Sequence, residues 1–163
     1  GLVMYKKIIT LILFIFVFSV FVNVANAAPD ADALVFFANK ASVKTDSLTL
    51  KELEQIYLSK MTAWPDKKSG NITAFNLAID SPERAALQKL VLKMSGEDEK
   101  KYWIQKRIEG KENPPESKKT AVMVQMMVSK MEGAIGYCFY KDIQDNIKGD
   151  LLFLKIDGNE GLK

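Results

Sequence analysis

Apolar residues with strand-like spacing mark four segments of the chain. Residues 33–38 are continuously apolar, which predicts a strand buried on both faces. Residues 72–79 carry β-branched and aromatic side chains in rough alternation, which predicts a second strand. We expect two more strands over residues 134–139 and 151–156. Gly136, inside the third strand, indicates that another part of the chain approaches its backbone closely.

Apolar residues spaced three and four apart predict the first two helices. A capping box of Thr49 and Glu52 opens a helix over residues 49–58. After the second strand, Ser81 is a good N-cap and Pro82 suits the first helical position. The apolar residues that follow Pro82 recur at helical spacing, so we expect a helix here.

Two further helices are expected in the second half of the chain. Residues 97–108 predict a helix that turns Tyr102, Trp103 and Ile108 inward. Residues 120–131 are apolar almost all round, which predicts a helix buried between two layers. The intervening residues, 110–117, contain two consecutive prolines and are expected to form a loop.

The order of these elements predicts the fold class. Strand, helix, strand, three helices, strand, a short turn or helix and a last strand indicate an α/β protein. We expect a three-layer domain with a central mixed β-sheet flanked by helices. Trp64, in the connection after the first helix, is expected to cover an edge of the core; stacking against a ligand is the alternative.

The amino-terminal segment has the pattern of a secretory signal. Lys6 and Lys7 precede an apolar run over residues 8–22, and an Ala-Asn-Ala site ends at Ala27. We therefore predict a signal peptide over residues 1–27, cleaved after Ala27, and a single domain over residues 28–163. An uncleaved membrane anchor is the alternative, but the apolar run is shorter than the roughly 20 residues that span a bilayer.

Composition excludes several classes of function. Removing the signal lowers the formal net charge from +3 to a value near neutral, and no basic stripe remains, so nucleic acid is not an expected partner. The chain has no histidine, which removes Ser-His-Asp and Cys-His nucleophilic sites and the usual zinc site. No carboxylate pair is marked by its spacing as acid and base, so we expect no enzyme, no metal and no cofactor.

Cys138, the lone cysteine, is expected to be a buried small residue; a reactive thiol is the alternative.

The turn from the second strand into the second helix is the candidate binding site. A helix N-terminus at the end of a strand offers free N–H groups and the positive end of the helix dipole to an anion. The candidate residues are Ser81, Glu83 and Arg84. The alternative is that this turn is only a helix cap in a strand–helix unit. We expect the Arg84 side chain to lie along the surface or to pair with Glu83 or with an acid of the following turn, unless it turns back toward the helix start.

Four stretches together resemble one protein family. They are residues 48–60 with Trp64, 72–90, 109–111 and the Gly-Ala-Ile-Gly-Tyr segment 133–137. In this order they resemble the periplasmic substrate-binding protein of phosphate ABC transporters, a type 2 periplasmic binding protein. The resemblance covers one of that family's two lobes. It implies a periplasmic location, phosphate or another small oxyanion as ligand, and an ABC permease as partner. The predicted signal implies membrane contact only through that segment before cleavage.

The candidate site departs from the pattern of this family. The family places an arginine near the strand end and Ser-Gly-Thr at the helix start. Here Ser81 matches the serine, while Pro82, Glu83 and about Leu77 stand at the glycine, threonine and arginine positions. Proline has no N–H, a glutamate repels an anion, and each lost contact is worth about 1.5–3 kcal/mol. Two hypotheses follow: a solute-binding domain for an ABC-type uptake system, or a ligand-free single-lobe scaffold or interaction protein of the cell envelope.

Overall fold

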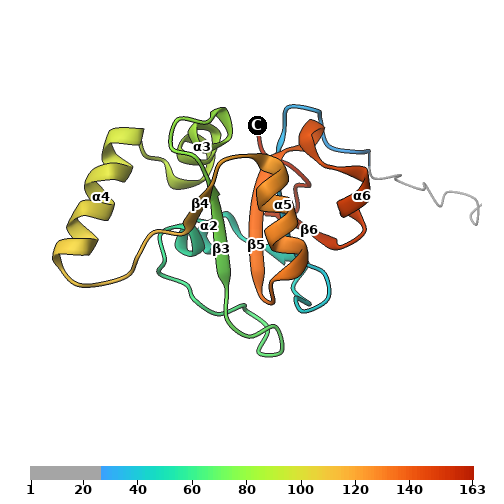
Figure 1. Cartoon of the computed structure of the whole chain (residues 1–163), viewed down its shortest axis with the longest axis horizontal. Coiled ribbons are helices and arrows are strands. Elements are labelled where there is room, and N and C mark those ends of the chain that lie inside the picture. The colour runs from blue at the N-terminus through green and yellow to red at the C-terminus, as the bar shows by residue number, and fades with distance from the viewer. Residues whose placement is uncertain (1–26) are drawn as a thin grey trace, which may run out of the picture.

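A computed structural model describes residues 27–163 of the chain (Figure 1). Residues 1–26, which hold most of the predicted signal, lie outside the described residues. The element order along the described chain is the predicted α/β order with two short strands added.

A six-stranded mixed sheet forms the centre of the domain, with the order β2-β6-β1-β5-β3-β4. β1 runs antiparallel to both of its neighbours, whereas the pairs β2–β6, β3–β5 and β3–β4 are parallel. The strands are β1 (Leu34–Asn39), β2 (Ser47–Leu48), β3 (Thr73–Leu77), β4 (Glu116–Lys118), β5 (Ala134–Phe139) and β6 (Leu151–Ile156). The predicted mixed sheet is confirmed.

α2 and α3 begin where the polar caps predict. Thr49 forms a full capping box with Glu52, and Ser81 caps α3 through the backbone N–H of Arg84. The α-helices are α2 (Leu50–Tyr57), α3 (Pro82–Leu87), α4 (Gly96–Ile108), α5 (Ala121–Lys130) and α6 (Asp145–Lys148). A π-helix (Gln88–Leu92) continues α3, and a 3-10 turn (Tyr140–Asp142) follows β5.

Alternation along β5 places helices on both faces of the sheet. Tyr137 points to one face, where its ring lies 5.4 Å from the ring of Tyr57 in α2. Gly136 points to the other face, where α5 lies so close that a β-carbon would stand 2.4 Å from Val124 Cγ1. This contact confirms the predicted close approach at Gly136, and the two faces together make three layers. Figure 1 shows α4 at the left end of the molecule, away from the sheet.

Three features differ from the sequence-based predictions. α5 is not buried all round, because Met123 and Met126 are exposed while Val124 and Val128 pack on the sheet. Ile108 does not face inward; it is 74% exposed at the end of α4. The short strand β4 lies mostly in residues 110–117, which we expected to form a loop, and β2 was not predicted, because backbone pairing at a sheet edge needs no apolar pattern.

The helices over residues 27–163 are all too short or too polar to cross a membrane.

Candidate functional site

The candidate site lies where β3 ends and α3 begins. The Ser81 hydroxyl donates to the Ala78 carbonyl at 2.7 Å and accepts from the Arg84 backbone N–H at 3.1 Å. The Ser81 N–H itself donates to the same Ala78 carbonyl at 2.9 Å. Both polar groups of Ser81 that a ligand would use are therefore engaged in shaping the turn.

Arg84 is buried, contrary to the expectation that its side chain lies along the surface or pairs with Glu83 or an acid of the following turn. The guanidinium contacts Glu99 of α4, with Nη2 2.5 Å from Oε1 and Nε 3.1 Å from the same oxygen. Its Nη1 donates to the Leu77 carbonyl at 2.7 Å. The side chain thus turns back toward the end of β3, but its charge is neutralised by a carboxylate from another helix.

Glu99 is the centre of this buried polar cluster. It is 1% exposed. Besides Arg84, its Oε2 accepts from Gln88 Nε2 at 2.7 Å, so the π-helix and α4 are joined through one carboxylate. A buried charge is tolerated where it is paired and hydrogen-bonded, and Glu99 meets both conditions. The cluster fixes α4 to the rest of the domain.

A second polar group supports the turn from the core side. The Tyr137 hydroxyl donates to Asn76 Oδ1 and accepts from the Leu77 N–H at 3.2 Å. Burial raises the pKa of Tyr137 well above its ordinary value, so the hydroxyl keeps its proton at neutral pH. The end of β3 is therefore held at two groups of Leu77: its N–H bonds to Tyr137, and its carbonyl bonds to Arg84.

Few donors remain for a ligand at the start of α3. Pro82 has no N–H, and the N–H groups of Ser81 and Arg84 are already bonded. The N–H of Glu83 has no partner among residues 27–163. The half-buried Glu83 side chain forms no hydrogen bond or ion pair within the same residues, so it adds a negative charge beside this free donor. Ser81, Glu83 and Arg84 therefore share the first turn of α3, and the Glu83 N–H is a donor there without a partner among residues 27–163.

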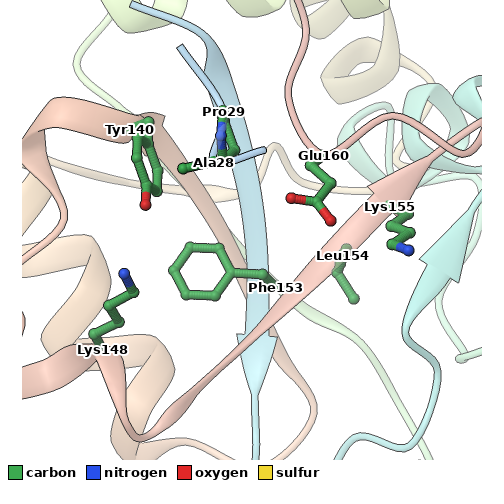
Figure 2. Close-up of a pocket in the computed structure, with 8 residues that line it drawn as sticks. All are labelled: Ala28, Pro29, Tyr140, Lys148, Phe153, Leu154, Lys155 and Glu160. Atoms are coloured by element: carbon green, nitrogen blue, oxygen red, sulfur yellow. The ribbon is translucent and has the colours of Figure 1, made fainter. Parts of the chain in front are cut away.

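A separate pocket of about 240 Å³ lies near the first described residues. Figure 2 shows Phe153 in this pocket with Tyr140, Lys148, Glu160 and Pro29 around it. The Lys148 ammonium lies 5.6 Å from the centre of the Tyr140 ring, a cation–π contact. None of the three candidate binding residues lines this pocket, so it is not part of the predicted site.

Two other residues singled out in the sequence are buried. Trp64 is 4% exposed, and its indole N–H donates to the Gly133 carbonyl at 3.0 Å, as expected for a residue that covers the core edge. Cys138 is fully buried, and burial raises the pKa of its thiol. The thiol is therefore protonated at neutral pH, as a small core residue would be.

Sequence reasoning missed Glu99, Asn76 and Tyr137 as members of this cluster. Glu99 stands in a run of charged residues that indicates a solvated helix start. Its spacing of four from Trp103 was the available signal, since two residues four apart share a helix face. Among residues 27–163, no three His, Cys, Asp or Glu side chains gather where they could hold a metal ion.

Three of the solved structures similar to this chain are named as phosphate transport or PstS proteins. A candidate phosphate ABC transporter substrate-binding protein of Clostridium perfringens, with bound phosphate, matches with a TM-score of 0.61 and 21% identity, over 80% of this chain and 47% of that one. An ABC-type phosphate transport receptor of Vibrio cholerae matches with a TM-score of 0.61 and 14% identity, over 80% and 48% of the two chains. PstS of Borrelia burgdorferi matches with a TM-score of 0.60 and 19% identity, over 78% and 48%.

These matches establish the fold and not the role. At such identities the likeness shows an α/β architecture shared with substrate-binding proteins, and the predicted fold class is confirmed. The chain spans about half the length of the structures that it matches. The names of these neighbours are those of transport proteins and not of enzymes, which agrees with the expectation of a non-enzyme. No protein-family model and no curated protein sequence matches the chain.

Proposed function

We propose that this protein is a solute-binding domain that takes a small oxyanion such as phosphate at the start of α3, in the service of an ABC-type uptake system. The observation that carries the proposal is the free Glu83 N–H at a strand-to-helix turn. The fold shared with phosphate receptors supports it, and so does the Ser81 cap at this turn.

The proposed affinity is low. Pro82 removes one donor, the carboxylate of Glu83 repels the ligand, and Glu99 neutralises the charge of Arg84. Each lost charge-assisted contact costs about 1.5–3 kcal/mol, so two of them weaken binding by about two to four orders of magnitude. We therefore expect phosphate to bind in the millimolar range.

Isothermal titration of the purified protein with phosphate, sulfate and small carboxylates tests this proposal. The double variant Pro82→Gly with Glu83→Thr restores an N–H and removes the repelling charge, so it should bind phosphate at least about tenfold more tightly than the unmodified chain. Glu97→Thr is the matched control, since Glu97 has the same position in the first turn of α4 as Glu83 in α3. If neither the unmodified protein nor the double variant gave heat of binding at millimolar ligand, the proposal would be contradicted.

A second candidate is an interaction domain of the cell envelope with no solute. The observation that favours it is the internal use of Arg84 and Ser81, whose donors bond to Glu99, Leu77 and Ala78 and not to solvent. Under this alternative, the unmodified chain gives no heat with any anion, whereas the double variant gains phosphate binding.

We further propose that the protein is exported to the periplasm and cleaved after Ala27. The described fold already includes the residues that directly follow this point: Asp30 pairs with Lys163, and Leu34 pairs with Leu162. Cleavage there would leave the described domain whole. Mass spectrometry of the protein released from the periplasm should give Ala28 as its first residue; an intact signal segment in the mature protein would contradict this.

A further inference from the structure

α4 carries one surface that the rest of the domain leaves open. A groove of about 560 Å³ runs between α4 and the loop after β3. α4 contributes Lys100, Trp103, Ile104 and Arg107 to it, which are spaced three and four apart and so share one helix face. Ile79 from the loop lines the opposite side.

Three of the residues that line the groove, Ile79, Trp103 and Ile104, have apolar side chains. Ile79 is 60% exposed and Ile104 is 45% exposed, while Trp103, which also lines the groove, is buried. Ile108, one turn beyond Ile104, extends the exposed apolar stripe along α4. Neighbouring exposed aliphatic side chains around a hollow mark interaction sites more often than isolated ones do.

The charges around the groove are positive. Arg84 and Glu99 also line it, but they neutralise each other. Lys100 and Arg107 are exposed and form no ion pair with any of residues 27–163. The groove therefore offers two uncompensated cations beside its apolar surface.

Trp103 adds an unused hydrogen-bond donor. Its indole N–H is buried and has no partner among residues 27–163, unlike that of Trp64. A buried donor without an acceptor costs about 1–3 kcal/mol, which an acceptor brought by a partner would recover after a small shift of α4. Carbonyl and carboxylate oxygens are such acceptors.

We propose that this groove is the docking site for a segment of a partner protein that carries an aliphatic side chain next to acidic ones. The aliphatic side chain covers Ile79 and Ile104, the carboxylates pair with Lys100 and Arg107, and an oxygen of the segment accepts from Trp103. A second copy of this chain placed symmetrically on the groove would oppose Lys100 and Arg107 with the same cations, which disfavours self-association here. The inference does not depend on anion binding at α3.

Selection from a library of short random peptides on the protein purified from cells that express the full chain tests this inference. Enriched peptides should combine an aliphatic residue with Asp or Glu. Synthetic copies should bind at least about tenfold more weakly to Ile104→Asp and to Arg107→Glu. Met126→Asp on α5 and Lys101→Glu on α4 are matched controls of similar exposure and charge, and they should leave the affinity within about twofold.

The indole signals in a nuclear magnetic resonance spectrum give an independent readout. The chain has two tryptophans, and Trp103→Phe assigns their signals. The Trp103 indole proton should move downfield on addition of the selected peptide, because it gains an acceptor, while that of Trp64 stays in place. An unmoved Trp103 signal, enriched peptides without acidic residues, equal binding to Ile104→Asp, or no enrichment at all would overturn the inference. So would a dimer of the protein alone that Ile104→Asp dissociates, because the groove would then be a self-interface.

Discussion

The α3 turn and the α4 groove lie on either side of the Arg84–Glu99 ion pair, and they differ in the polar groups that remain without a partner. On the α3 side, Ser81 bonds to its own turn, Pro82 has no N–H, and the Glu83 N–H has no partner among residues 27–163. On the α4 side, two exposed cations and a buried indole N–H have no partner among residues 27–163. The same ion pair therefore closes one polar site and positions the helix that carries the other.

This difference shows that a shared fold and an available site are separate properties. The chain shares its α/β fold with the solved structures that it matches, and the strand–turn–helix unit at Ser81 is part of that fold. Its polar groups, however, are used to stabilise the domain. Binding capacity has to be judged from unpaired donors and charges, and on that measure the α4 groove exceeds the α3 turn.

Loss of the Glu99 carboxylate should give the largest effect on both regions. Glu99→Ala leaves Arg84 buried without a counter-charge, which costs about 3–5 kcal/mol in the free energy of unfolding and releases α4 from the domain. Urea unfolding and hydrogen exchange of the α4 amides measure the two consequences. Glu97→Ala, exposed in the same turn, is the control and should change little.

A paired apolar replacement sharpens this prediction. Arg84→Met with Glu99→Leu removes both charges together, so it should recover most of the stability that Glu99→Ala loses. A loss below about 1 kcal/mol in Glu99→Ala would contradict the role given to the ion pair.

Removal of the Tyr137 hydroxyl should affect the α3 side alone. Tyr137→Phe deletes the bond to Asn76 and one acceptor of the Leu77 N–H, at a cost of about 1–2 kcal/mol. Tyr140→Phe is the control, because the Tyr140 hydroxyl forms no hydrogen bond with residues 27–163. Chemical denaturation of both variants measures the difference; equal stability of the two would show that the buried hydroxyl contributes nothing.

The two serine caps allow a direct comparison of α3 with α4. Ser81 and Ser95 each accept from a backbone N–H three residues on, at 3.1 Å in both helices. Ser81→Ala and Ser95→Ala should each cost about 1 kcal/mol. Only Ser81→Ala should alter phosphate binding, and only Ser95→Ala should alter peptide binding. Thermal unfolding of each variant with phosphate and with the selected peptide checks this. If Ser81→Ala altered peptide binding, or Ser95→Ala altered phosphate binding, the two sites would be coupled.

Asp66 provides the smallest predicted effect and lies in neither region. Hydrogen bonds from Thr45 and Ser69 hold the pKa of this carboxyl below its ordinary value. A lowered pKa in the folded state stabilises the fold above about pH 4, and the contribution is lost as the pH falls through the lowered value. Asp66→Asn should therefore make the free energy of unfolding fall less steeply as the pH is lowered below about 4, as measured by urea midpoints. The exposed Asp46 side chain has no such bonds among residues 27–163, so Asp46→Asn should leave the dependence of stability on acid pH unchanged.

Local chemistry in the sequence predicted most of the fold. The Thr49 and Ser81 caps, the buried run of β1 and the close approach at Gly136 all follow from short-range rules, and the structure has each of them. The exposed methionines of α5 did not follow, because an all-round apolar helix does not reveal which face meets the sheet.

The candidate site was less predictable than the fold. Its position at Ser81 followed from the cap, but the burial of Arg84 depends on Glu99, which lies 15 residues further along the chain. A charged run at a helix start has the same sequence signature whether its acids meet solvent or a buried arginine. Long-range pairing of this kind is set by how α4 packs, and that packing has no periodic pattern in the sequence.

The central claim is that the free donor at the start of α3 binds an oxyanion. Titration of the isotope-labelled protein with inorganic phosphate, followed residue by residue through backbone amide shifts, tests it most directly. The account predicts that the Glu83 amide shifts most, with its neighbours in the turn, and saturates in the millimolar range. Shifts confined to surface lysines, or no shift at Glu83, would contradict it.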